Sequence, residues 1–103
     1  LVYEDNDVTI IDDSESSLRS LNKTLDLKSV CGKIILPEIL EKAGANEADI
    51  IIAVSEEDES NILCCQLADF IFNIPTKVAR IKEAGFLNPK YYDNLFVKKV
   101  LRK

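Results

Sequence analysis

The chain alternates short apolar runs with longer segments in which apolar residues recur every three or four positions. The runs Val8–Ile11, Leu27–Cys31, Ile50–Val54 and Lys77–Ile81 are typical of strands. The segments between them have the spacing of helices that present one face to a core. Because strands joined by helical crossovers are parallel, the pattern predicts an α/β fold with helices flanking a parallel sheet of about four strands.

Residues at the ends of the helical segments indicate where each helix begins and stops. Asp13 or Ser14 can cap the first predicted helix, and Pro37 and Gly44 bracket the second. The apolar residues expected on their inner faces are Leu18, Leu21, Leu25, Ile39, Leu40 and Ala43.

The third predicted helix, residues 57–73, follows Ser55 and Asp58, which have the spacing of a capping pair. It is apolar around most of its circumference, so we expect it to be largely buried. The strand before it is apolar on both sides, as in a strand covered on both faces. Asn88 opens a last helix that ends in a basic terminus and carries these inward residues: Tyr92, Leu95 and Phe96.

Charge and composition exclude several classes of function. The net charge of −5 argues against a nucleic-acid partner, since phosphate binding requires a basic surface. The chain has no histidine, which excludes a histidine-ligated metal and histidine-based catalysis. Cys31, Cys64 and Cys65 have no disulfide spacing and are typical of a reduced, cytosolic protein. No apolar run is as long as a membrane span.

Polar residues directly follow the predicted strands, at the edge where parallel sheets bind ligands. The carboxyl ends of parallel strands meet on one side of a sheet, so we expect these residues to form the candidate site. They are Asp12, Asp13, Gly32, Lys33, residues 55–58 and residues 80–82.

The stretch TIIDDSESSLRSL permits two interpretations. It resembles the start of a response-regulator receiver domain, where paired acids hold magnesium beside a phospho-accepting aspartate. A receiver needs an aspartate after its middle strand and a later lysine–proline pair, but here the middle strand ends in Val54 and Ser55, and no Lys-Pro occurs. The alternative is a dinucleotide fold, in which an acid after the second strand accepts both ribose hydroxyls. Asp12 fits that acid, although the chain contains no G-x-G-x-x-G.

Two further stretches, LEKAGANEAD at residues 40–49 and AVSEEDESN at residues 53–61, are more specific. In their order and spacing they resemble the N-terminal RCK domain (regulator of potassium conductance) of Trk and Ktr potassium uptake systems. The similarity covers residues 1–82. It implies a Rossmann-like fold over residues 1–103, whose first strand and glycine-rich loop would precede Leu1.

The resemblance implies a cytoplasmic domain at the inner face of the membrane, without enzymatic activity. Such a domain binds NAD(H) or ATP/ADP and gates a membrane potassium transporter by changing shape, within a homo-oligomer that is at least a dimer. On this basis Asp12 would hold the adenosine ribose, while Asp13 is better suited to capping the helix. The other contacts implied by the resemblance are Gly32 and Lys33 near the adenine, Val54 and Ser55 beside the phosphates or second ribose, and Arg80 near the phosphates or a subunit contact.

Each candidate also has a purely structural explanation. Asp12 and Ser55 can cap helices, Gly32 can end a strand, and Arg80 can pair with a nearby acid. Asn61 is best explained as satisfying backbone groups between a strand and a helix.

Three expectations follow from the charges and from the missing segment. The acidic run at residues 56–59 would repel a phosphate, so we place no pyrophosphate there. Without a glycine loop, this chain should bind NAD or ATP weakly. Without a central strand, Val8–Ile11 and Ile50–Val54 should pair directly with each other or through a second copy of the chain. A fragment of an NAD-dependent dehydrogenase is the enzyme alternative.

Overall fold

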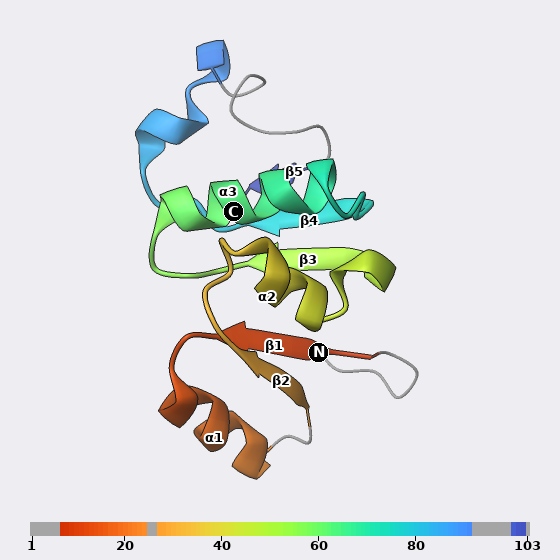
Figure 1. Ribbon diagram of the computed structural model, residues 1–103. Helices are drawn as coiled ribbons and strands as arrows, with labels where there is room; N and C mark the ends of the chain where they lie inside the picture. The colour runs from red at the N-terminus through yellow and green to blue at the C-terminus, as the bar shows by residue number, and fades with distance from the viewer. Residues whose placement is uncertain (1–6, 25–26, 92–99, 103) are drawn as a thin grey trace. The chain divides into compact units, whose positions relative to one another are not determined.

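The computed structural model describes residues 7–24, 27–91 and 100–102 (Figure 1). The chain forms two compact units, Leu1–Gly44 and Ala45–Lys103, and its two sheets are divided between them. Each unit consists of parallel strands with helices packed against them. The predicted α/β, Rossmann-like class is therefore confirmed.

The first unit pairs two parallel strands, with Thr9 opposite Lys28 and Asp12 opposite Cys31. The helix that connects the strands contacts both of them, and the helix after the second strand contacts that strand. These elements are β1 (Thr9–Asp12), α1 (Glu15–Thr24), β2 (Lys28–Cys31) and α2 (Pro37–Lys42).

The start of α1 is capped by one of the two predicted residues. The Ser14 hydroxyl oxygen accepts a hydrogen bond from the backbone N–H of Ser17 at 3.3 Å, which makes Ser14 the cap. Asp12 supports the same turn, since its Oδ1 accepts the N–H of Ser14 at 2.8 Å. Asp13 is exposed and takes no part in the bonds described for this cap.

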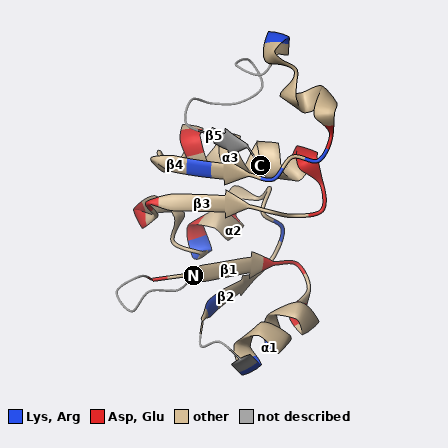
Figure 2. Cartoon of the chain, turned by 180° about the vertical axis from the view of Figure 1, so that it is seen from behind, with Lys and Arg blue, Asp and Glu red and all other residues tan. Residues whose placement is uncertain are grey.

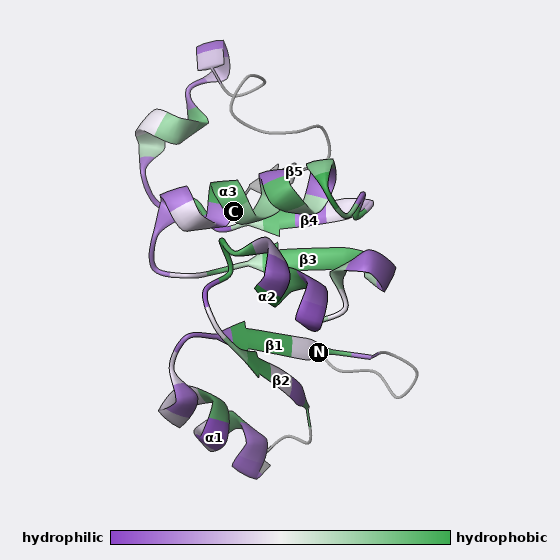
Figure 3. Cartoon of the chain, in the orientation of Figure 1, coloured by the Kyte–Doolittle hydropathy of each residue, from purple (hydrophilic) through white to green (hydrophobic). Residues whose placement is uncertain are grey.

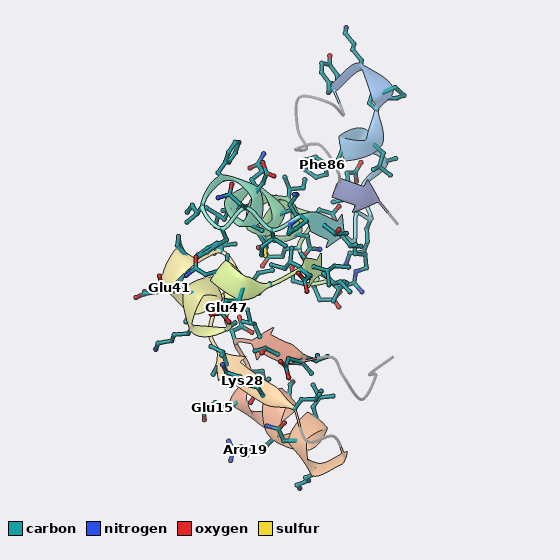
Figure 4. The ribbon with its side chains drawn as sticks, turned by 90° about the vertical axis from the view of Figure 1, so that its right-hand side faces the viewer. Glu15, Arg19, Lys28, Glu41, Glu47 and Phe86 are labelled. Carbon is teal, nitrogen blue, oxygen red and sulfur yellow. The ribbon has the colours of Figure 1, made fainter. Side chains whose placement is uncertain are left out.

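The faces of α1 follow the predicted pattern in part. Leu18 is buried, whereas Leu21 is partly exposed, and Leu25 lies outside the described residues. Charged residues occupy the outer side of the helix, where Glu15 and Arg19 lie 3.6 Å apart at i, i+4 spacing (Figure 4).

The start and stop predicted for α2 are confirmed. Pro37 is its first residue, a position where the missing N–H costs nothing. The helix ends at Lys42, and Gly44 then adopts a φ of 93°, the left-handed conformation that glycine tolerates best.

The second unit is built on a three-stranded parallel sheet in the order β3-β4-β5, and α3 packs on the first two of these strands. Its core lies between this helix and the sheet. Two 3-10 helices, η1 and η2, complete the unit. Its elements are η1 (Ala45–Glu47), β3 (Ile50–Ala53), α3 (Asp58–Phe70), β4 (Thr76–Ala79), η2 (Ala84–Leu87) and β5 (Val100–Arg102).

In the second unit, β3 is buried on one face, whereas the sequence predicts that both of its faces are covered. Figure 3 shows β3 as apolar along its length, but Ile50 and Ile52 are 51% and 58% exposed. The prediction that both faces of this strand are covered is therefore wrong for one face. The side chains that do form the core include Ala53, Ile62, Cys65, Ala68, Ile74 and Ala79.

The predicted burial of α3 is likewise met on one side only. Leu63, Phe70 and Ile71 are 39%, 72% and 49% exposed. The helix also stops three residues earlier than the expected residue 73, because Asn73 adopts a left-handed φ of 53° before the loop to β4.

A buried lysine in β4 was not predicted. The Lys77 ammonium donates to the carbonyl oxygen of Ile74 at 2.7 Å and lies 3.0 Å from a carboxylate oxygen of Asp69. Its side chain is 2% exposed, whereas that of Asp69 is 36% exposed. Lys77 therefore ties the C-terminal end of α3 to the strand that follows it.

The expectation that a helix extends to the C-terminal end is wrong. Val100–Arg102 is a strand that pairs with β4, not the basic end of a helix. The positions expected inside that helix, Tyr92, Leu95 and Phe96, lie outside the described residues. In the part of the chain that the structure describes, β1 and β3 belong to different sheets. Their expected pairing through a second copy of the chain stays a prediction.

Candidate functional site

The first group of candidate residues lies at the carboxyl ends of β1 and β2. Gly32 donates its N–H to the carbonyl oxygen of Asp12 at 2.9 Å, so these two backbones are adjacent. Asp12 is half-buried, and its carboxylate already accepts the N–H of Ser14. Asp13 and Lys33 are exposed beside them. The structure therefore brings all four predicted residues of the first unit to one edge of its sheet.

The glycine at position 32 has a packing explanation. A Cβ added there would overlap the Ile39 side chain, with its Cγ1 at 2.7 Å and its Cδ1 closer still. Gly32 lets α2 approach the end of β2 closely, which accounts for the residue type without a ligand. Its predicted contact with an adenine stays a prediction.

In the second unit, Asn61 connects the ends of two strands. Its Oδ1 accepts the N–H and the hydroxyl of Ser55, both at 2.8 Å. Its Nδ2 donates to the carbonyl oxygens of Ser55 at 3.0 Å and Arg80 at 2.9 Å. The predicted role of Asn61 in satisfying backbone groups is confirmed, and it holds the residues after β3 and β4 together.

Arg80 lies across the same two strand ends. Its backbone N–H donates to Ala53 at 2.9 Å, and its Nη2 donates to the carbonyl oxygen of Ser55 at 2.9 Å. The same nitrogen is 3.4 Å from the Glu56 carboxylate, which is the ion pair that the sequence left open as an alternative to a ligand. The Nε is enclosed and has no hydrogen-bond partner among the described residues. Val54, just before this cluster, is 50% exposed.

Glu56 joins this cluster from the loop between β3 and α3. Its second carboxylate oxygen is 3.1 Å from the ammonium of Lys82. The hydrogen bond and charge of Lys82, followed by the charge of Arg80, lower the pKa of Glu56 from its ordinary value. Figure 2 shows basic and acidic segments close together where β4 leaves the sheet, beside the start of α3.

Asp58 does not form the predicted capping pair with Ser55. The cap position of α3 is Glu57, whose side chain makes no capping bond. The Asp58 carboxylate instead accepts the backbone N–H groups of Lys82 at 3.0 Å and Glu83 at 2.7 Å. These two bonds lower the pKa of Asp58 and fix the segment after β4 to the first turn of α3.

The two adjacent cysteines of α3 belong to the core. Burial raises the pKa of Cys64 to about 12 and that of Cys65 to about 11. The Cys65 thiol lies 3.7 Å from the carbonyl oxygen of Val78 as a weak donor. Protonated, enclosed thiols are poor nucleophiles, so these cysteines are packing residues. Cys31, in contrast, is exposed at the end of β2.

The chemistry of the described residues is that of binding through carboxylates, amides and fixed cations. Among these residues, no group of three cysteines and acids is placed to hold a metal ion. No helix in the described part of the chain is long and apolar enough to cross a membrane. Asp12, Asp13, Gly32 and Lys33 belong to the first unit, and Val54, Ser55 and Arg80 to the second.

Sequence reasoning missed part of the second cluster. It singled out Ser55 and Arg80, but it did not predict that Glu56 would pair with both cations or that Asp58 would bind the backbone after β4. The signal was present in the alternating charges of residues 56–58 and 80–83. Which of these charges pair depends on the order of the strands in the sheet, and a single sequence does not reveal that order.

Comparison with related proteins shows the family to which this chain belongs. The model of the TrkA-N domain family matches residues 1–102. The Trk system potassium uptake protein TrkA of Haemophilus influenzae is 42% identical over 96 residues, which are 93% of this chain and 20% of that protein. TrkA of Vibrio alginolyticus is 43% identical over 90 residues, 87% of this chain and 20% of its own length. A TrkA homolog of Methanothermobacter thermautotrophicus is 32% identical over 81 residues, which are 79% of this chain and 37% of that protein.

The parallel strands, the helices packed on them and the polar strand ends define the class as a Rossmann-like domain. Within that class, the match over residues 1–102 shows that the chain belongs to the TrkA-N domain family. The resemblance to this family found in the sequence is thereby confirmed. The chain spans 20% of the length of the Haemophilus and Vibrio relatives.

Proposed function

We propose that this chain is the nucleotide-binding domain of a regulatory protein in a potassium uptake system. The observation that carries the proposal is the half-buried Asp12 at the carboxyl end of β1, with the backbone of Gly32 beside it. In a Rossmann-like fold an acid at a strand end accepts the two ribose hydroxyls of a dinucleotide. The names of the TrkA relatives support the link to potassium uptake.

The ligand is NAD(H) or ATP/ADP, and it is bound without being turned over. Asp12 is the proposed contact for the adenosine ribose, and Ser55 and Arg80 are the proposed contacts for the phosphates. A bound nucleotide shifts the domain between two shapes by the difference in its affinity for them. That shift gates a membrane potassium transporter, at whose cytoplasmic face the domain is located.

Residues 1–103 act as one domain in this proposal, and copies of the chain associate with one another. Support for association comes from α3, where an apolar stripe follows helical spacing on the exposed side. We call this the α3 stripe; it consists of Leu63, Leu67, Phe70 and Ile71. Apolar stripes of this kind on a soluble protein commonly mark contacts with another chain.

Titration of the isotope-labelled chain with NADH, followed by NMR, tests nucleotide binding. We expect weak binding with chemical-shift changes at Asp12 and Gly32, because the 103 residues contain no G-x-G-x-x-G. Asp12→Asn should weaken the binding by about tenfold, the loss typical of a charged hydrogen bond. Asp13→Asn is the matched control, since it removes the same charge at the next, exposed position.

Equal losses in Asp12→Asn and Asp13→Asn, or shifts that bypass both residues, would contradict the proposed ribose contact. Coupling to transport is tested separately, by potassium uptake in cells whose intact protein carries Asp12→Asn. We expect uptake to lose its response to the nucleotide. An unchanged response would remove the regulatory part of the proposal and leave the binding part in place.

A further inference from the structure

Glu56 holds two cations at the end of β4 although its side chain is 87% exposed. Its carboxylate oxygens lie 3.4 Å from Nη2 of Arg80 and 3.1 Å from Nζ of Lys82. The first contact is longer than a good charge-assisted hydrogen bond, which spans about 2.7–2.9 Å. Exposed ion pairs contribute little to stability, so this carboxylate is held loosely.

The guanidinium of Arg80 is held more firmly than the carboxylate that it binds. Nη2 of Arg80 also donates to the carbonyl oxygen of Ser55 at 2.9 Å, which fixes the guanidinium against the end of β3. The backbone N–H of Lys82 is bound to Asp58 at 3.0 Å. Nε of Arg80 is enclosed and has no partner among the described residues. The fixed guanidinium of Arg80 and the ammonium of Lys82 therefore form a positive position that the loosely held Glu56 occupies.

We propose that Glu56 is a tethered anion that occupies a phosphate position at Arg80 and Lys82, and that a phosphate group of a bound nucleotide exchanges with it. This inference rests on the proposed function and adds a regulatory contact to it. A phosphate offers several oxygens around one centre and can accept from Nη2 of Arg80 and from Nζ of Lys82 together.

In this exchange, Glu56 in the loop between β3 and α3 competes with phosphate for the same two cations. While Glu56 occupies the cations, only the fraction of molecules with a displaced carboxylate can accept phosphate, and the apparent affinity falls by that fraction. Once phosphate binds, Glu56 is released. Because Glu56 is in the loop between β3 and α3, phosphate binding changes the contacts that hold this loop to the end of β4.

NMR of the isotope-labelled chain, observing Nε–H of Arg80, tests the exchange with inorganic pyrophosphate as the probe. Glu56→Gln should bind pyrophosphate about three- to tenfold more tightly than the unsubstituted chain, as expected for losing a weak competing ion pair and one negative charge. Glu57→Gln is the matched control, because it removes the same charge from the adjacent exposed residue, for which no ion pair is described. Adding Lys82→Gln to Glu56→Gln should reverse the gain.

Equal gains in the two glutamine variants would show a general charge effect and overturn the exchange, as would the absence of a pyrophosphate response at Arg80 in every variant. A parallel titration with NADH separates this inference from the proposed function. If pyrophosphate responds to Glu56→Gln but NADH does not bind, the competition at Arg80 and Lys82 stands for pyrophosphate, while the proposed function and the nucleotide exchange that rests on it fail. If NADH binds both forms equally, the function stands and the exchange is wrong.

Discussion

Asn61 is fully buried, and both polar atoms of its side chain are bound to the residues that follow β3 and β4. Only asparagine and glutamine carry an acceptor oxygen and an NH2 donor in one planar amide group, and the glutamine side chain is one methylene longer. The sequence motif AVSEEDESN thus has a physical explanation at its last position. The asparagine holds two strand ends in register, and Arg80 and Ser55 are positioned as a consequence.

Asn61→Ala should destabilise the chain by about 2–4 kcal/mol, because it leaves buried backbone groups of Ser55 and Arg80 without partners. Urea unfolding followed by circular dichroism measures the change in the free energy of unfolding. Asn46→Ala, at an exposed asparagine of η1, is the control and should change stability by less than about 0.5 kcal/mol. Similar values for the two variants would mean that the Asn61 bonds are replaced by water at little cost.

Asp58 should make the chain sensitive to acid. Because its folded-state pKa lies below its ordinary 3.8, its stabilising effect is complete above that value and is lost as the pH falls through the folded-state pKa. The free energy of unfolding, measured from about pH 5 to about pH 2, should fall with the pH, and Asp58 and Glu56 should each contribute up to about one extra proton bound by the unfolded state. Asp58→Asn should flatten this pH dependence, whereas Asp13→Asn should leave it in place. A pH dependence unchanged by Asp58→Asn would contradict the assignment.

At the scale of an element, the connection from α3 to β4 is organised by charge as well as by packing. Lys77 enters the interior beneath the C-terminal end of α3, where the carbonyl oxygen of Ile74 and the carboxylate of Asp69 receive its ammonium. A cation is favoured at this end of a helix by the direction of the helix dipole. The pair therefore favours one arrangement of the loop around Asn73 and Pro75.

Removing only the acid of this pair should be more harmful than removing both charges. Asp69→Ala should cost about 1–3 kcal/mol, less than a fully buried pair, because the carboxylate is partly solvated. Lys77→Met keeps the apolar stem and should change stability by less than about 1 kcal/mol. Chemical unfolding of the double variant, Asp69→Ala with Lys77→Met, supplies the test. This double variant should be more stable than Asp69→Ala alone. A double variant less stable than either single one would contradict an uncompensated buried charge as the cause.

At the scale of the whole molecule, the exposed apolar residues are concentrated on α3 and β3. The α3 stripe itself carries no charged side chain, although Glu59 lies one turn before Leu63 on the same side of the helix. An antiparallel contact between two copies would place Leu63 of each opposite Phe70 of the other. Such a contact is self-complementary, as a twofold interface requires.

Phe70→Ser should weaken self-association by about fivefold or more, since Phe70 is the most exposed member of the stripe and large aromatics dominate interface energies. Sedimentation velocity over a range of concentrations measures this effect. Tyr91→Ser, at an exposed aromatic outside the stripe, is the control. The proposal fails if the unsubstituted chain is monomeric at every concentration, or if both substitutions have the same effect.

The sequence predicted the positions of the described strands better than it predicted the side-chain contacts around them. Four strands lie where the apolar runs placed them, and Ser14, Pro37 and Gly44 mark helix ends as expected. The partners of Asp58 and Glu56 could not be predicted, because Lys82 and Glu83 approach them only after β4 pairs beside β3. Val100–Arg102 looked like a helix end because three residues are too few to show a strand period.

The amino-acid order by itself determined the parallel α/β class, since hydrophobic period and capping residues are local properties that survive without coordinates. Its motifs gave only a resemblance to the family, which the match over residues 1–102 then showed. Tertiary structure alone decided which charges meet. It buried Lys77 against Asp69, joined two strand ends through Asn61, and placed the Glu56 carboxylate on two cations. These contacts connect residues far apart in the chain, and their energies depend on burial and distance, which exist only once the strands are paired.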